Sequence, residues 1–402
     1  MTAFVGNTRY RTMVNGNRVN FVTKKLLPYD AEIEYLAGTG TQYIDTLFYP
    51  RASLTDIKVE NKFNKSVQSG DHCVLGARTG IDGSQGFKLP NFYNKTLEYQ
   101  GLIPANASGN ITTFNIDTDY TSIVEIKQGS QKVYVDGVLK IEQSNSSNCD
   151  AGGNLYLFAM NQSGAKWFFN GKIYYCKIWQ DDILVRDFIP VRKGTVGYMY
   201  DRVSGQLFGN AGTGDFVLGN DIVPIEYLEK PSDNNARIIL DTAADAVFEI
   251  TAQATATSNT SMILIGRNVS GGGGTWFGVP PNVNGCWGLT SNSGGYSNVS
   301  SLNKTDITVD FTTNPVVGTI GSSTFSRAKG GGNSNWYVFC AGTNGYPFTG
   351  RLYSLKAHIN NALALDLIPV RVGTTGYLFD KLTRTLYGNA GTNDFVLGPD
   401  KT

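Results

Sequence analysis

The feature that most constrains the fold of this chain is an internal duplication. Residues 188–221 read FIPVRKGTVGYMYDRVSGQLFGNAGTGDFVLGND, and residues 367–400 read LIPVRVGTTGYLFDKLTRTLYGNAGTNDFVLGPD. The two segments are identical at 21 of 34 positions, with a constant offset of 179. A repeat of this length is a duplicated domain, because solenoid repeats recur every ~20–50 residues. The sequence therefore predicts two copies of one domain.

The similarity between the copies extends upstream of this segment. Residues 170–179 (NGKIYYCKIW) match 349–358 (TGRLYSLKAH), and with a two-residue slip 155–159 (LYLFA) match 336–340 (WYVFC). The copies also open alike, with IEYLAGTGTQYIDT (33–46) and IEYLEKPSDNNARIILDT (225–242). We therefore expect domains at 33–221 and 225–402, preceded by a separate segment, 1–28.

Composition and residue patterning both favour β-structure. The chain has 47 Gly, 21 Tyr and 21 Phe, and its 17% of charged residues lies below the typical ~25%. Alternating apolar residues flank Asp136-Gly137, which is a strong signal for a two-residue hairpin. No segment holds a 3.6-residue period over three turns. We predict an all-β fold with two tandem β-sandwiches.

Comparison of the copies predicts which residues face the core. In the strand 172–179, Tyr174, Cys176 and Ile178 are matched by apolar residues in the second copy, so this face is assigned to the core. Cys176 is replaced by Leu355, which indicates a small buried hydrophobe. The five cysteines show no CxxC spacing, and we expect neither a disulfide framework nor a zinc site.

Charge and hydropathy argue against several classes of partner. The net charge is +1, which gives no electrostatic basis for binding nucleic acid or an anionic membrane. No apolar run reaches the ~18–20 residues of a membrane-spanning helix. The N-terminal sequence lacks the apolar core of a signal peptide, so we expect synthesis in a cytoplasm.

Candidate catalytic and metal-binding residues are sparse. The repeated segment FGNAGTGDFVLG (208–219) lacks the ending of a phosphate loop. The only histidines, His72 and His358, are not shared between the copies, which disfavours a catalytic triad. No cofactor is expected, although structural calcium is an alternative to turn capping for four aspartates: Asp201, Asp215, Asp380 and Asp394.

The repeated segment itself is interpreted as architecture. Each occurrence closes a domain, and Asn210 or Asn389 with the neighbouring glycines suits a tight turn. Asp215 or Asp394 is expected to cap that turn, and Phe-Val-Leu to form the last strand.

Carbohydrate binding is the site hypothesis with the most support. Sugars present C–H faces to aromatic rings and hydroxyl groups to polar side chains. Aromatic residues lie among Gly, Asn and Ser in two regions that read as long loops: Trp276, Trp287 and Tyr296 in the second copy, and Phe92 and Tyr93 in the first. The alternative is that these rings pack beneath their own loops or at a subunit contact.

The N-terminal segment belongs to neither copy. It carries a hairpin signal at Asn15-Gly16 and no acidic residue before Asp30. We interpret it as a docking arm, in which the recognition residues are Arg9, Tyr10, Arg11, Arg18 and Phe21. The alternative is a loosely attached hairpin.

The opening Ile33–Thr46 and the endings Asp187–Asp221 and Asp366–Asp400 resemble the laminin-G-like, concanavalin A-like lectin domains of gut Bacteroidales and their tailed phages. The resemblance implies a jelly-roll fold and a non-enzymatic protein of the phage virion surface, as a head fibre, capsid decoration or tail-associated protein. It also implies a homotrimer or other homo-oligomer, a capsid or other virion partner for residues 1–28, and surface glycans as ligands. The alternatives are a polysaccharide-active enzyme, which needs two facing carboxylates, and a bacterial adhesion lectin.

Overall fold

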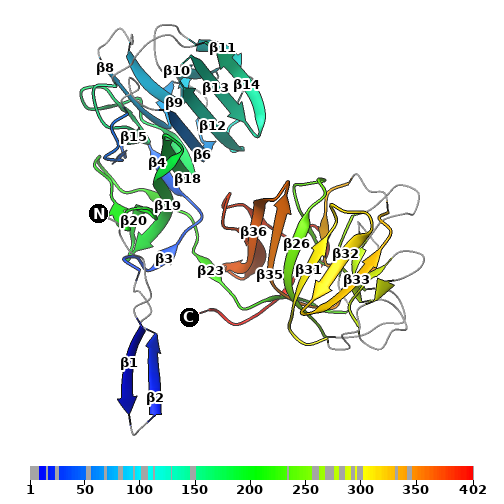
Figure 1. Ribbon diagram of the computed structural model, residues 1–402. Helices are drawn as coiled ribbons and strands as arrows, with labels where there is room; N and C mark the ends of the chain where they lie inside the picture. Colours follow the sequence, from blue (N-terminus) through cyan, green and yellow to red (C-terminus); the bar gives the residue numbers. More distant parts are fainter. Residues whose placement is uncertain are drawn as a thin grey trace. The chain divides into compact units, whose positions relative to one another are not determined.

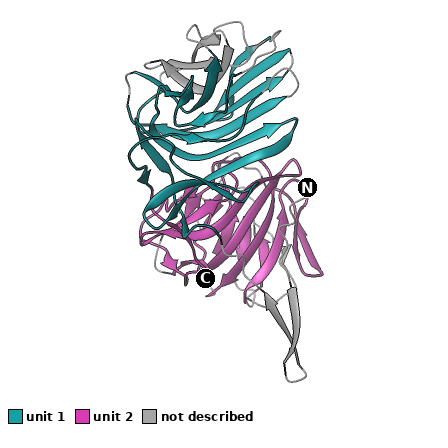
Figure 2. Ribbon diagram, turned by 90° about the vertical axis from the view of Figure 1, so that its left-hand side faces the viewer, with its two compact units in different colours: residues 1–218 teal, residues 219–402 magenta. Residues whose placement is uncertain are grey.

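The structure is a computed structural model of the 402-residue chain, and it divides into two compact units, Met1–Leu218 and Gly219–Thr402 (Figure 2). The part of the chain that it describes comprises residues 9–14, 17–22, 27–50, 56–67, 70–79, 85–93, 96–100, 107–111, 114–127, 129–144, 151–232, 235–255, 262–267, 276–279, 286–290, 295–296, 302–330, 334–341 and 346–401. These residues form strands and turns, and none of them lies in a helix that could cross a membrane.

Apart from the N-terminal hairpin, the described residues of unit 1 form two mainly antiparallel sheets (Figure 1). The larger sheet has the order β14 (Val138–Gln143), β13 (Ser130–Val135), β12 (Asp119–Lys127), β6 (Ile57–Lys65), β18 (Asn170–Gln180), β19 (Ile183–Lys193), β20 (Val196–Asp201), β21 (Gln206–Phe208), joined by β3 (Ala31–Glu32), β4 (Leu36–Thr39) and β22 (Val217–Leu218). The smaller sheet has the order β11 (Ala107–Ile111), β10 (Thr96–Gln100), β9 (Gln85–Tyr93), β8 (Leu75–Thr79), β15 (Tyr156–Leu157), β5 (Ile44–Asp45), with β7 (Asp71–Cys73), β16 (Met160–Asn161) and β17 (Ala165–Lys166) beside it.

Unit 2 repeats this topology. Its larger sheet has the order β33 (Ser323–Arg327), β32 (Val316–Ile320), β31 (Thr305–Asp310), β26 (Val247–Ala254), β35 (Gly350–Ile359), β36 (Ala362–Val372), β37 (Thr375–Asp380), β38 (Leu386–Tyr387), joined by β23 (Ile222–Pro224), β24 (Leu228–Lys230) and β39 (Val396–Leu397). Its smaller sheet has the order β25 (Ile238–Ile239), β34 (Tyr337–Val338), β27 (Met262–Gly266), β28 (Trp276–Val279), β29 (Gly288–Thr290), β30 (Gly295–Tyr296).

The core of each unit lies between its two sheets. In unit 1, Val59 and Ile178 of the larger sheet and Leu75 and Leu157 of the smaller sheet belong to one fully buried cluster. A second cluster of the same kind fills unit 2. Two sheets that enclose one apolar layer are a β-sandwich. The all-β fold of two tandem sandwiches is therefore confirmed.

A β-bulge corrects one predicted face. The register between β18 and β6 shifts between Ile173 and Tyr175, so the alternation of inward and outward residues changes there. Cys176 and Ile178 are buried as predicted, together with Ile173. Tyr174 instead faces away from the core, where its hydroxyl donates a hydrogen bond to Asp119 Oδ1 at 2.7 Å.

The repeated closing segment ties the end of each unit to its opening strand. Asn210 Oδ1 accepts hydrogen bonds from the backbone N–H of Tyr43 (3.1 Å) and Gly212 (2.8 Å). In unit 2, Asn389 Oδ1 accepts the same two bonds, from Arg237 (3.1 Å) and Gly391 (2.8 Å). Each amide group also donates to a carbonyl four residues ahead. One side chain thus joins the two ends of each sandwich, which explains why the segment occurs twice.

The capping role predicted for Asp215 is wrong for this turn, because Asn210 performs it; for Asp394 it stays a prediction. Both aspartates are exposed, and Asp215 contributes its backbone carbonyl, which accepts a 3.0 Å bond from Gln42 Nε2. Asp201 and Asp380 are fully buried turn caps: Asp201 accepts from the N–H of Asp187 at 2.8 Å, and Asp380 from that of Asp366 at 3.0 Å. The calcium alternative for these aspartates stays a prediction.

The Asp-Thr dipeptides that end the two opening segments, Asp45-Thr46 and Asp241-Thr242, are not structurally equivalent. Thr46 N donates to Leu155 O, and the corresponding bond in unit 2 runs from Leu240 N to Trp336 O. Thr46 therefore corresponds to Leu240 rather than to Thr242. The first strand of the second copy still pairs with the equivalent partner, as β25 with β34.

The N-terminal segment forms a hairpin of β1 (Arg9–Val14) and β2 (Asn17–Val22), which pair with each other in the described structure. Val14 lies opposite Asn17, and the predicted turn residues Asn15 and Gly16 lie outside the described residues. Tyr10 lies opposite Phe21. The side chains of the predicted docking residues lie outside what the structure describes.

Candidate functional site

The candidate site is the face of the smaller sheet that points away from the core, here called the aromatic face. In unit 1, Tyr156 pairs with Asp45 on one side and with Gly76 on the other. Their neighbours Leu157 and Leu75 are fully buried. Since side chains alternate along a strand, Tyr156 and Asp45 face outward. Gly76 adds no side chain to this face and is itself buried beside the ring.

Aromatic rings gather around Tyr156. The Tyr43 ring stacks on it with centroids 4.7 Å apart, and Phe168 lies 6.3 Å from Tyr43. All three rings are partly exposed. Burial, aided by the nearby Asp45 carboxylate, raises the pKa of Tyr156, so its hydroxyl stays protonated near neutral pH. The cluster therefore offers flat apolar surface with hydroxyl groups at its edge.

Polar side chains border these rings. Asn154 Nδ2 donates to Asp45 Oδ2 at 3.3 Å, and Asn161 Nδ2 donates to the Asn154 carbonyl at 2.9 Å. Carboxylate and amide groups beside aromatic rings are the combination that binds sugar hydroxyls and C–H faces together.

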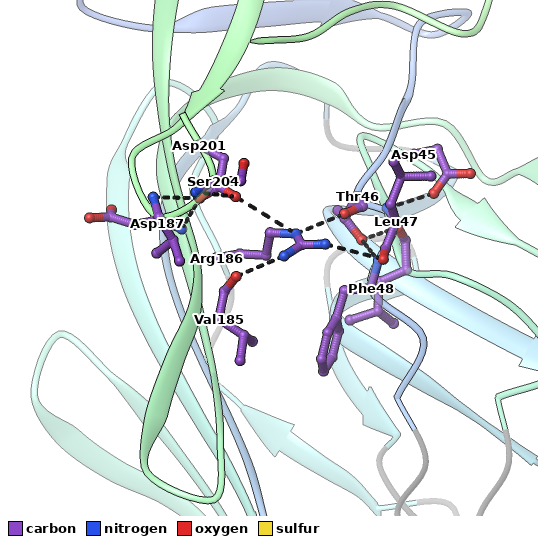
Figure 3. Close-up of polar contacts among 11 residues, drawn as sticks. Asp45, Thr46, Leu47, Phe48, Val185, Arg186, Asp187, Asp201 and Ser204 are labelled. Carbon is purple, nitrogen blue, oxygen red and sulfur yellow. Dashed lines mark hydrogen bonds and ion pairs between the residues drawn. The ribbon is translucent and has the colours of Figure 1, made fainter. Parts of the chain in front are cut away.

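The strand that carries Asp45 is held in place by Arg186 (Figure 3). Its guanidinium donates to the carbonyls of Thr46 at 3.0 Å and Leu47 at 3.2 Å, and it lies 3.9 Å from the buried Asp201 carboxylate. Leu47 has a left-handed φ of 51°, and its N–H donates to Asp45 Oδ1 at 2.9 Å. Such a φ costs a non-glycine residue about 1–2 kcal/mol. Arg186 fixes this bend and, through it, the carboxylate.

The same face in unit 2 carries the same arrangement with different residues. Tyr337 occupies the place of Tyr156 and pairs with Gly266, which pairs in turn with Trp276. A Cβ atom at Gly266 would lie 2.5 Å from the Trp276 ring, so the indole covers the glycine. Trp276 Nε1 donates to the Arg267 carbonyl at 3.0 Å, which fixes the ring.

A second shared feature is an aromatic residue in the left-handed region, Trp167 in unit 1 and Tyr346 in unit 2, with φ of 48° and 50°. Their carbonyls accept equivalent bonds, from Cys73 N (2.8 Å) and Ile263 N (2.9 Å). The ring of Tyr346 lies 5.7 Å from that of Trp276, and Tyr346 is 46% exposed.

The predicted glycan-binding residues have different positions. Trp276 lies half-buried on the aromatic face. Trp287 is fully buried, with its ring stacked on Phe277 and Phe348, which fits the alternative of packing beneath its own loop. Trp287 is therefore corrected to a core residue. Phe92, Tyr93 and Tyr296 have backbones on β9 and β30, and their side chains lie outside the described part of the structure.

Sequence reasoning missed Tyr43, Tyr156, Trp167, Tyr337 and Tyr346. A signal for two of them existed. Trp167 and Tyr346 are separated by 179 residues, the offset of the duplication itself, in segments of otherwise low similarity. An aromatic residue that both copies keep at this offset, at a position that does not belong to the alternating core residues, indicates a surface feature common to both units.

No protein-family profile matches the chain, and no curated protein matches it. Among solved structures, the chain is similar to domains LG4-5 of the mouse laminin α1 chain (10% identity, 94% of this chain and 97% of that chain, TM-score 0.28). It is also similar to a Bacteroides ovatus protein provisionally assigned to carbohydrate binding (12%, 46% and 60%, TM-score 0.35) and to the LG1-3 region of the laminin α2 chain (10%, 96% and 69%, TM-score 0.30). With TM-scores of 0.28 to 0.35, these similarities assign neither a family nor a ligand to the chain.

Proposed function

We propose that this chain is a non-enzymatic glycan-binding protein with one binding face on each unit. The observation that carries the proposal is the recurrence of the aromatic face. Both units pair a tyrosine with a glycine on the outward side of the smaller sheet, Tyr156 with Gly76 and Tyr337 with Gly266. Both also hold an aromatic residue at left-handed φ nearby. The sequences of the surrounding loops have diverged between the two copies. Common ancestry alone therefore does not explain why the tyrosine, the glycine and the left-handed aromatic residue were all retained.

Removing the two tyrosines is expected to abolish most glycan binding. In the double variant Tyr156→Ala and Tyr337→Ala, the loss of ring stacking weakens each site about tenfold, or roughly 1.4 kcal/mol. The measurement is oligosaccharide-array binding followed by calorimetric titration of the best ligand. The matched control is Trp179→Ala, a half-buried ring on the larger sheet that contacts Lys58. Equal loss in the control, or none in the double variant, would refute the assignment of this face.

We further propose that the protein is displayed on a bacteriophage virion as a homo-oligomer, commonly a trimer in proteins that it resembles. Residues 1–28 would dock to a capsid or other virion protein. Two features support this proposal: the resemblance of the sequence to phage-associated lectin domains, and an N-terminal hairpin whose described strands pair with each other rather than with either sandwich.

Deletion of residues 1–28 is expected to prevent incorporation into particles while both sandwiches stay folded. The fold is kept because the described strands of the arm pair with no strand of either sandwich. The measurement is mass spectrometry of purified virions beside calorimetry of the truncated protein. Normal incorporation of the truncated protein would show that docking lies elsewhere.

A further inference from the structure

The left-handed aromatic residues mark a part of the aromatic face where the two units differ. Trp167 and Tyr346 are equivalent by their backbone bonds and their φ angles. A non-glycine residue in this region costs about 1–3 kcal/mol, and such strain persists where the surroundings impose it. Both copies retain an aromatic residue there although glycine would remove the strain. This retention indicates that the ring is required.

The partner of the ring is a cation in unit 1. The Arg78 guanidinium lies over the Trp167 ring with its central carbon 3.9 Å from the ring centroid, which is a stacking distance. Arg78 also donates to Gln162 Oε1 at 2.8 Å. Arg78 follows Gly76 by two residues on β8, so it shares the outward face with the glycine beside Tyr156.

The partner of the ring in unit 2 is another aromatic residue. Tyr346 faces Trp276, with their planes inclined by 45°. Pairing of Gly266 with Tyr337 makes Gly266 the equivalent of Gly76, so the sequence position equivalent to Arg78 is Asn268, an uncharged residue. The ring at left-handed φ therefore faces a guanidinium in unit 1 and an indole in unit 2. Trp276, which pairs with Gly266, stands where Lys88 pairs with Gly76 in unit 1.

We propose that the two units bind different classes of sugar: Arg78 on Trp167 in unit 1 binds an acidic sugar through its carboxylate or sulfate group, and Trp276 with Tyr346 in unit 2 binds the C–H face of a neutral sugar. This inference rests on the proposed function. The N–H groups of a guanidinium lie in its own plane, so they point sideways when its face stacks on a ring. There a pair of them matches the two oxygens of a carboxylate or sulfate. Stacking on Trp167 also restricts the long side chain, which lowers the entropy that binding would cost.

The test uses the full-length chain and two matched pairs of probes. One pair is oligogalacturonate and its methyl ester, which differ by the carboxylate charge. The other pair is a sulfated oligosaccharide and its desulfated form. For Arg78→Gln, we expect at least a tenfold loss of affinity for one or both charged probes, and a charged-to-neutral affinity ratio that falls toward one. The salt dependence of binding should fall with it. Arg78→Lys, which keeps the charge without the planar fork, should lie in between.

A loss confined to oligogalacturonate identifies a carboxylate subsite, and a loss confined to the sulfated probe identifies a sulfate subsite. The matched control is Lys58→Gln, which removes one positive charge from unit 1 at the Trp179 ring and is expected to leave all four affinities unchanged. Tyr346→Ala should weaken binding of the neutral probes by about tenfold. Calorimetry confirms that each variant is folded.

Two results separate failure of this inference from failure of the proposed function. If Arg78→Gln binds the charged probes like the wild type while Tyr156→Ala weakens binding, the face binds glycans and the charge assignment is wrong. If the wild type binds none of the four probes and no other oligosaccharide, the proposed function itself fails and the inference falls with it.

Discussion

Replacing Gly212 with alanine is expected to lower the free energy of unfolding of unit 1 by about 3 kcal/mol, the upper end of the usual cost of overpacking. A Cβ atom at Gly212 would lie 2.1 Å from the carbonyl oxygen of Thr41, which is backbone and cannot rotate away. The equivalent atom at Gly391 would lie 2.0 Å from the carbonyl of Asn235. Gly391→Ala should therefore destabilise unit 2 by a similar amount.

Scanning calorimetry measures this effect as a fall in the unfolding temperature of one transition, by roughly 6–12 °C for a unit of this size. The matched controls are Gly194→Ala and Gly373→Ala. These glycines have φ of 59° and 60° and nothing within 4 Å of an added Cβ, so alanine there costs only the strain of left-handed backbone, about 1 kcal/mol. A Gly212→Ala variant as stable as Gly194→Ala would contradict the close approach.

Replacing Asn210 or Asn389 with alanine is expected to cost about 2–3 kcal/mol in the unit concerned. The substitution removes three hydrogen bonds and leaves two backbone N–H groups without their acceptor. The cost should be at least as large for Asn389. In unit 1, Gln42 adds a second link by donating to the Asp215 carbonyl, whereas Ala236 stands at the equivalent position in unit 2.

Chemical denaturation of each single variant measures these costs. Asn210→Asp keeps the acceptor oxygen and loses the amide donor, so it should fall between the wild type and Asn210→Ala. Asp215→Ala should change the stability by less than about 0.5 kcal/mol, because that side chain is exposed and its contribution is a backbone carbonyl. A larger effect from Asp215→Ala than from Asn210→Ala would restore the aspartate as the turn cap.

The sequence was sufficient to predict the architecture because the duplication supplied a second copy against which to check each pattern. A residue such as Cys176, matched by Leu355, could be assigned to the core since both are apolar, and both are fully buried. The reasoning failed at Tyr174, where a β-bulge shifts the alternation. A bulge inserts one residue, and no particular residue type marks it in the sequence. A strict alternation of inward and outward residues therefore assigns the wrong face to residues on one side of the bulge.

The site was harder to predict because aromatic residues serve both cores and surfaces. Trp287 and Trp276 lie in the same glycine-rich stretch, yet one is fully buried and the other half-exposed. The difference comes from strand pairing across the smaller sheet, and pairing between distant segments is not encoded in local composition. Tyr156 escaped notice for the same reason, since its neighbours Asp45 and Gly76 are far away in the sequence.

A crystal structure of the full-length chain with a bound oligosaccharide tests the central claim most directly. The expected result is a sugar ring stacked on Tyr156 in unit 1, on Trp276 and Tyr346 in unit 2, or on both faces. A sugar bound elsewhere, with the rings of Tyr156 and Tyr337 uncovered, would contradict the claim that the aromatic face is the glycan-binding surface.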